Sequence, residues 1–183
     1  MRVLPLTPKS FSLALSVLKG GGVIIHPTET CYGLACDLTN PAAVARRFTR
    51  KKRPLNQPVS SLFSSIEQVK QYVLWNAQAE TLAKKSLPGP LTLILPLRII
   101  APHILYPTPP RTSDKGHRTK DEVRTIGIRI SSHPIAQELV ERFGKPLSTT
   151  SANIHGHPPT YCPEEILAQF SDDLPDTLLL DSG

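Results

Sequence analysis

Residues 125–153 place a strand, a helix and a second strand in direct succession, and this unit constrains the fold more than any other part of the sequence. In "TIGIRI", three isoleucines alternate with Thr125, Gly127 and Arg129, which is the two-residue period of a strand with one buried face. "SSHPIAQELVERFG" indicates a capped helix closed by Gly144, and "KPLSTTSAN" indicates a strand that runs into a polar turn. Strands interleaved with helices are typical of α/β folds.

The first half of the chain shows the same alternation. An amphipathic helix is expected over 11–18, with Ser10 as its cap and Gly20 in the left-handed closing position. An apolar strand follows at 23–26, and Asn40 and Pro41 open the next helix.

The rest of the chain adds further elements of both kinds. A helix over 64–73 carries a capping-box pattern in Ser64 and Glu67, and "AQAETLAKKSL" indicates another helix. The expected strand "LTLILPL" has Leu93, Ile94 and Leu95 in the core, and "PEEILAQF" and "TLLLD" are the last helix and strand. Together these patterns predict a layered α/β sandwich without internal repeats.

The length of 183 residues suits a single domain, 1–183, with one sizeable core and no second C-terminal domain. The hydrophobic fraction of 39% and the charged fraction of 20% are those of a soluble globular protein. Residues 106–123 have almost no apolar content, so an exposed, mobile insertion loop is expected there. Such a loop is either a functional lid or a disordered insertion.

Charge is distributed unevenly along the chain. Up to Lys145 all 21 Lys and Arg face nine acidic residues, whereas six acids and no Lys or Arg follow. The densest run, "RRFTRKKR" over 46–53, holds six cations in eight residues. By default such a run is a solvated helix face, and the alternative is a site for nucleotide phosphates or an RNA backbone.

No feature predicts secretion, a membrane span or a metal site. No apolar run approaches the roughly 18 residues that a span needs. The three cysteines are odd in number and lack zinc-type pairing, which favours a reducing cytoplasm. The six histidines show no metal-ligand spacing either.

Polar residues gather where three of the expected strands end. "HPTETCYG" follows one strand, Arg129 lies in another, and "STTSAN" follows a third. Each of them has an ordinary structural explanation as a turn, a cap or an exposed side chain. In an α/β sheet, however, ligands bind where loops converge at strand ends.

Five blocks, "PTETCYGL", "KKRP", "PGPLTLIL", "TIGIRISSHP" and "PLSTTSAN", stand in this order over nearly the whole chain. Together they resemble the YrdC/TsaC family of threonylcarbamoyl-AMP synthases, and the ordered set is far more specific than any one block. The resemblance implies a YrdC-like α/β fold, which is an open, twisted mixed β-sheet flanked by helices. It also implies a basic concave face that serves as the active site.

The resemblance further implies a reaction. Such enzymes are nucleotidyltransferases that condense L-threonine, bicarbonate and ATP into L-threonylcarbamoyladenylate and pyrophosphate, the first step of the tRNA modification t6A. ATP is then a substrate, Mg²⁺ would be held mainly by its phosphates and water, and no protein-bound metal is needed. A downstream threonylcarbamoyl transferase would carry the product to tRNA.

The same resemblance assigns roles to individual residues. The catalytic positions are Lys51, Arg53 and Arg129. Those on the ATP side are Lys51, Arg53, Gln57, Thr125 and Asn153. Those on the threonine side are Thr28, Thr30, Tyr32, Arg129 and Ser151. Arginine suits a planar carboxylate or phosphate, which its fork binds through paired hydrogen bonds.

Two alternatives remain open at this point. One is a non-catalytic YrdC-like domain that binds double-stranded RNA or tRNA on its basic surface. The other is a degenerate paralogue that keeps the fold but not the reaction. The "KxR" and "SAN" blocks are both present, which places the paralogue behind the enzyme and the RNA-binding module.

Overall fold

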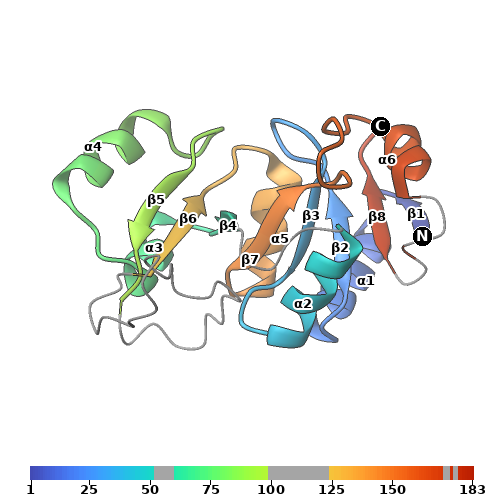
Figure 1. Ribbon diagram of the computed structural model, residues 1–183, viewed down its shortest axis with the longest axis horizontal. Helices are drawn as coiled ribbons and strands as arrows, with labels where there is room; N and C mark the ends of the chain where they lie inside the picture. The colour runs from blue at the N-terminus through green and yellow to red at the C-terminus, as the bar shows by residue number, and fades with distance from the viewer. Residues whose placement is uncertain (52–59, 99–123, 171–173, 175–176) are drawn as a thin grey trace, which may run out of the picture.

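The computed structural model describes residues 1–51, 60–98, 124–170, 174 and 177–183 (Figure 1). Its helices are α1 (Pro8–Lys19), α2 (Pro41–Arg50), α3 (Ile66–Tyr72), α4 (Ala77–Ser86), α5 (Pro134–Phe143) and α6 (Pro163–Phe170). Its strands are β1 (Arg2–Pro5), β2 (Val23–His26), β3 (Gly33–Asp37), β4 (Ser60–Leu62), β5 (Leu93–Pro96), β6 (Thr125–Arg129), β7 (Leu147–Ser151) and β8 (Leu178–Asp181). The expected loop 106–123 lies outside the described residues.

All of these strands belong to one open sheet, in the order β1-β8-β2-β3-β7-β4-β6-β5. β8 pairs in parallel with both β1 and β2, and β4 pairs in parallel with β6, whereas the other neighbours are antiparallel. The sheet is therefore mixed, as expected. Its centre is the β3–β7 pair, in which Gly33 lies opposite Ser151.

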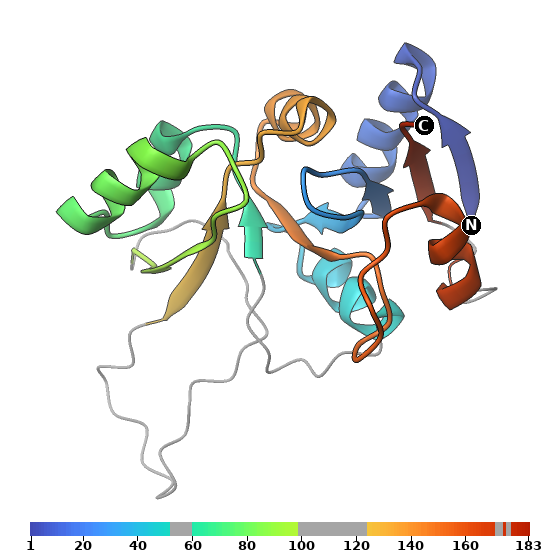
Figure 2. The same ribbon diagram turned by 90° about the horizontal axis from the view of Figure 1, so that it is seen from above.

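Two apolar clusters cover the two faces of the sheet. α1 and α5 pack together over Ile24, Ala35 and Leu147, while α2, α3, α4 and α6 contribute to the cluster around Ile25, Leu34 and the isoleucines of β6. Figure 2 shows α1 and α5 on the opposite side of the central strands from α2 and α6. The three-layer arrangement follows from strands with apolar residues on both faces.

The strand–helix–strand unit forms as its sequence predicts. Ile126 and Ile128 are buried and Arg129 lies on the opposite face of β6, which confirms the predicted alternation. His133 caps α5, and Gly144 closes it with a φ of +78°. α6 spans the predicted eight residues.

Several local predictions are wrong by a residue or more. Thr7, not Ser10, caps α1; Ser10 is instead the reciprocal partner of Thr7 in the capping box. Ser65, not Ser64, caps α3. Ile94 is 70% exposed, because β5 is an edge strand with only one covered face.

The prediction that Gly20 closes α1 in the left-handed conformation is also wrong. Gly20 has a φ of −75°, and the left-handed residue is Gly21, with a φ of +75°. A Cβ on Gly21 would lie 2.8 Å from Nδ2 of Asn40 and 3.0 Å from Nη2 of Arg46. Both the backbone and the close packing against α2 therefore require glycine at this position.

We expect Gly21→Ala to lower the free energy of unfolding by about 1–3 kcal/mol, because it strains the backbone and crowds α2. Gly20→Ala is the matched control, since its Cβ would meet the Ser16 and Val17 carbonyl oxygens at 3.4 and 3.6 Å, which are ordinary contact distances. Denaturant titration of the two variants measures the difference. Equal losses would show that the left-handed conformation at position 21 is not a constraint.

Candidate functional site

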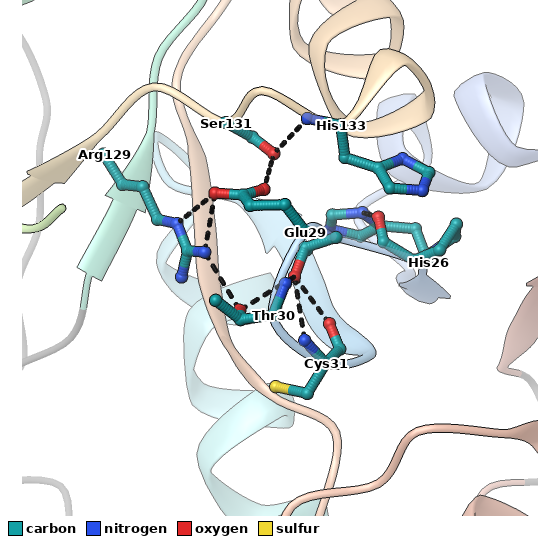
Figure 3. A network of polar contacts seen from close by, with 9 residues as sticks. His26, Glu29, Thr30, Cys31, Arg129, Ser131 and His133 are labelled. Carbon is teal, nitrogen blue, oxygen red and sulfur yellow. Dashed lines mark hydrogen bonds and ion pairs between the residues drawn. The ribbon is translucent and has the colours of Figure 1, made fainter. Parts of the chain in front are cut away.

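The turn between β2 and β3 is closed by the hydroxyl of Thr28. This hydroxyl donates to the Cys31 carbonyl at 2.6 Å and accepts from the backbone N–H groups of Thr30 and Cys31. The structural explanation of the "PTET" stretch is thus correct for Thr28. The turn also places Glu29 and Thr30 beside the end of β6 (Figure 3).

Arg129, at the end of β6, meets this turn through three hydrogen bonds. Its Nη2 and Nε donate to Oε1 of Glu29 at 2.8 and 3.3 Å, and Nη2 also donates to Oγ1 of Thr30 at 2.9 Å. The two charged side chains are only 19% and 15% exposed, so solvent weakens their interaction less than that of a surface pair.

The second carboxylate oxygen of Glu29 is held from the loop before α5. Ser131 Oγ donates to Oε2 of Glu29 and accepts from the backbone N–H of His133 at 3.1 Å. Burial raises the pKa of Glu29, but the hydrogen bonds from Ser131 and Arg129 outweigh burial and hold that pKa below its usual value. Glu29 is therefore ionised at neutral pH.

A buried cation lies at the carboxyl end of β7. Lys51, which is 3% exposed, donates to Oδ1 of Asn153 at 2.8 Å and to the carbonyl and hydroxyl of Ser151. Asn153 in turn donates to the His157 carbonyl. The ammonium group therefore fixes the "SAN" turn relative to the end of α2.

Between these two networks lies a concavity of about 170 Å³ that opens to solvent. It is lined by Thr28, Thr30, Cys31, Tyr32, Gly33, Ser60, Arg129, Thr149, Thr150 and Ser151. The register explains much of this lining. Gly33 pairs with Ser151, and Ser60 pairs with both Thr149 and Gly127, two residues before Arg129. Paired residues share a face, so these side chains gather on one side of the sheet.

The sequence-predicted site residues fall into three groups. Thr28, Thr30, Tyr32, Arg129 and Ser151 all line the concavity. Lys51 and Asn153 do not line it but join it through Ser151. Thr125 is exposed at the opposite end of β6 from Arg129, so it is not part of this concavity. Arg53 and Gln57 lie outside the described residues.

The solvated-face interpretation of the basic run is wrong for two of its described cations. Arg47 is 1% exposed, with its guanidinium carbon 4.6 Å from the centre of the Phe48 ring, and Lys51 is buried as described above. Arg46 also turns inward at its tip, since Nη2 donates to the Gly21 carbonyl at 2.7 Å. These cationic side chains therefore make contacts within the protein instead of forming a fully solvated helix face.

Sequence reasoning missed several residues of the site. Glu29 stands inside the "PTET" block, but its partner Arg129 is one hundred residues away, and no local pattern reveals the pair. Thr149 and Thr150 belong to the "STTSAN" block and could have been included on that ground. Ser60 opens a three-residue strand whose sequence carries no strand signal.

His26 lies beneath the turn and is completely buried. Burial lowers its pKa to about 4, and a hydrogen bond between Nδ1 and the Pro27 carbonyl, 3.0 Å away, only partly offsets this. A carbonyl can only accept, so Nδ1 carries the proton of the neutral ring. Nε2 has no partner within the described part of the chain.

Within the described ranges, the cysteines and the other titratable groups are arranged neither as a metal centre nor as a disulfide. All three cysteines are free, and burial raises the pKa of Cys36 to about 11. Among the described residues, no group of three or more His, Cys, Asp or Glu is arranged to hold a metal ion. No helix in the described ranges is both long and apolar enough to cross a membrane.

A mixed sheet with a polar concavity is typical of α/β domains that bind small ligands. Comparison with known proteins is more specific. The Sua5/YciO/YrdC family model, described as "Telomere recombination", matches residues 16–183. The chain belongs to this family.

Relatives with assigned names agree with this placement. A threonylcarbamoyl-AMP synthase of Enterobacter sp. is 34% identical over 169 residues, which are 91% of this chain and 82% of that protein. The protein of the same name from Vibrio campbellii is 33% identical over 171 residues, 91% of this chain and 84% of that protein.

Solved structures show the same fold. P. abyssi Sua5 complexed with L-threonine superposes with a TM-score of 0.81 at 28% identity, covering 100% of this chain and 50% of that one. E. coli YciO gives a TM-score of 0.79 at 25% identity, with 100% and 83% covered. The chain thus spans half the length of the P. abyssi protein, and the expected YrdC-like fold is confirmed.

We expect Lys51→Met to lower the free energy of unfolding by roughly 2–4 kcal/mol, because it leaves the acceptors of the "SAN" turn without their buried cation. Lys84→Met is the matched control, since the Lys84 side chain is 73% exposed. Denaturant titration of both variants provides the measurement. A Lys51→Met protein as stable as the control would contradict a structural role for this ammonium.

His26 makes stability depend on pH in a defined direction. Its folded pKa of about 4 lies below the ordinary value of 6.5, so between these limits the unfolded chain binds the extra proton. The contribution is complete above pH 6.5, and about 3 kcal/mol is lost as the pH falls to 4. We expect unfolding free energies of His26→Gln to fall less steeply over this window than those of the unmodified protein. Parallel curves would mean that His26 titrates normally.

Proposed function

We propose that this chain is a threonylcarbamoyl-AMP synthase, which condenses L-threonine, bicarbonate and ATP into L-threonylcarbamoyladenylate with release of pyrophosphate. The observation that carries the proposal is the polar concavity in which Arg129, Thr30 and Ser151 converge from three separate segments. Relatives named for this activity match about nine-tenths of the chain.

The amino acid would bind at the Arg129 end of the concavity. Arg129 uses Nε and Nη2 within the protein, and Nη1 has no hydrogen-bond partner among the described residues. Its two N–H groups suit a substrate carboxylate. Thr28, Thr30 and Tyr32 belong to the turn that bounds this end, and Ser151 lies beside that turn, because it pairs with Gly33. A neighbour of the same fold, P. abyssi Sua5, has been solved with L-threonine.

ATP would approach from the "KxR" and "SAN" side. Lys51 binds Ser151 and Asn153 directly, so the cation, the polar turn and the concavity form one connected unit. Arg53 and Gln57 would extend this side toward the phosphates, and Thr125 would lie near the nucleotide. Mg²⁺ would be held mainly by the ATP phosphates and water.

The chemistry requires positioning more than a protein nucleophile. The threonine amine condenses with bicarbonate to a carbamate with loss of water, and a carbamate oxygen attacks the α-phosphorus of ATP while pyrophosphate leaves. Two anions must be held together while negative charge grows on the leaving group, so fixed cations and close approach supply the main catalytic effects. Lys51, Arg53 and Arg129 would provide those cations.

The proposed reaction also implies a downstream enzyme and a cellular compartment. The unstable adenylate would pass to a separate threonylcarbamoyl transferase that forms t6A on tRNA. Free cysteines suit a reducing compartment, so we place the reaction in the cytoplasm. Binding of double-stranded RNA or tRNA to a basic concave face is the alternative function, and the excess of Lys and Arg before Pro146 favours it.

The decisive experiment incubates the protein with ATP, Mg²⁺, bicarbonate and each amino acid in turn, and detects pyrophosphate and the carbamoyladenylate by mass spectrometry. The proposal expects both products with threonine, and neither when bicarbonate or threonine is omitted. RNA affinity that falls steeply with added salt, without any turnover, would instead establish the binding module.

We expect Arg129→Ala to raise the KM for threonine by about 10- to 100-fold, because the carboxylate loses a charged hydrogen-bond donor. The KM for ATP should stay near that of the unmodified enzyme. Arg142→Ala, which removes an exposed arginine of α5, is the matched control. Steady-state kinetics with either substrate varied separates the two constants, and an unchanged threonine KM would show that Arg129 does not bind the amino acid.

A further inference from the structure

Glu29 has no assigned role, yet it is the residue that holds Arg129 in place. An arginine side chain has several rotatable bonds and loses roughly 2 kcal/mol of rotamer entropy when it is ordered. Arg129 is ordered by paired hydrogen bonds to one carboxylate oxygen, at 2.8 and 3.3 Å. Figure 3 shows the remaining guanidinium nitrogen pointing away from Glu29.

Glu29 is itself anchored from a second element. Ser131 is buried and donates to Oε2, while its own oxygen accepts from the backbone N–H of His133, the residue that caps α5. Three successive hydrogen-bonded links, Arg129 to Glu29, Glu29 to Ser131 and Ser131 to the His133 N–H, therefore connect Arg129 to the start of α5. A rigid helix end is a better reference point than a turn alone.

The two carboxylate oxygens of Glu29 accept hydrogen bonds from different residues. Oε1 accepts from Arg129 and Oε2 accepts from Ser131, so the carboxylate plane is fixed from both ends. Because Glu29 offsets the charge of Arg129 on one edge only, the guanidinium keeps an open edge of N–H donors on the concavity that it lines. A carboxylate ligand binds such an edge without displacing Glu29.

We propose that Glu29 is a positioning residue, which fixes the guanidinium of Arg129 so that its Nη1 edge receives the carboxylate of an amino-acid ligand. This inference rests on the proposed function, because it assumes that Arg129 binds the amino acid. Glu29 touches neither the ligand nor the reacting atoms. Its effect should therefore disappear once Arg129 is removed.

The test is a double-mutant cycle on the full chain, with the Kd for L-threonine from calorimetry and the KM values from pyrophosphate release. Glu29→Gln keeps the shape and one acceptor but removes the charge. We expect it to raise the Kd and KM for threonine by about 10-fold and to leave kcat and the KM for ATP within about 2-fold. In the Arg129→Ala background the same change should have no further effect.

Two other variants complete the design. Ser131→Ala should weaken threonine binding in the same direction by a smaller factor, and it tests the network if Glu29→Gln fails to fold. Glu138→Gln is the matched control, because Glu138 pairs with Arg142 on the exposed surface of α5 and should leave threonine binding unchanged.

Each remaining outcome is decisive. If the unmodified protein does not bind threonine, the proposed function fails and this inference fails with it. If it binds threonine and Glu29→Gln binds equally well, the inference alone is overturned. The inference also fails if Glu29→Gln weakens binding by the same factor with and without Arg129, since Glu29 would then act on its own.

Discussion

The antiparallel pairing of β3 with β7 is the constraint on which the rest of the structure depends. It places Gly33 opposite Ser151 in the middle of the sheet, so the start of one strand meets the end of the other. β4 then pairs with β7 and β6 with β4, which brings Arg129 to the same face. A shift of one residue in this register would turn Ser151 to the opposite face and disperse the lining of the concavity.

Two cations, the buried Lys51 and the partly buried Arg129, stabilise the site in different ways. Among the described residues, Lys51 donates to uncharged acceptors, the oxygens of Ser151 and Asn153, and thereby joins the end of α2 to the "SAN" turn. Arg129 has a charged partner in Glu29, so it keeps its orientation while its net charge toward the concavity is reduced. The first arrangement fixes the backbone, whereas the second fixes one side chain. A site that must hold two anions together benefits from both.

The sequence correctly predicts those elements that are marked by local patterns, such as caps and periodicity. The helix closed by Gly144 and the strand of alternating isoleucines form as predicted, because caps and periodicity depend on neighbouring residues. β3 was missed because all five of its residues are buried and no polar alternation marks it. The left-handed residue was placed at Gly20 rather than Gly21 because adjacent glycines offer the same local chemistry. Only packing against Asn40 and Arg46 distinguishes them.

The sequence predicts many of the residues that line the site, but not the hydrogen bonds that join them. Resemblance named Arg129, Thr30 and Ser151, which do lie together, yet it gave no reason for Glu29, because that reason is a partner one hundred residues distant. The burial of Lys51 could not be predicted for the same reason, because its acceptors also lie about one hundred residues away in the sequence. Side-chain roles that depend on sheet register cannot be derived from residue types, since the register itself is a property of the folded sheet. The turn "PTET" therefore serves two purposes: Thr28 closes the turn through its hydroxyl, and Glu29 holds the guanidinium of Arg129 at the end of β6.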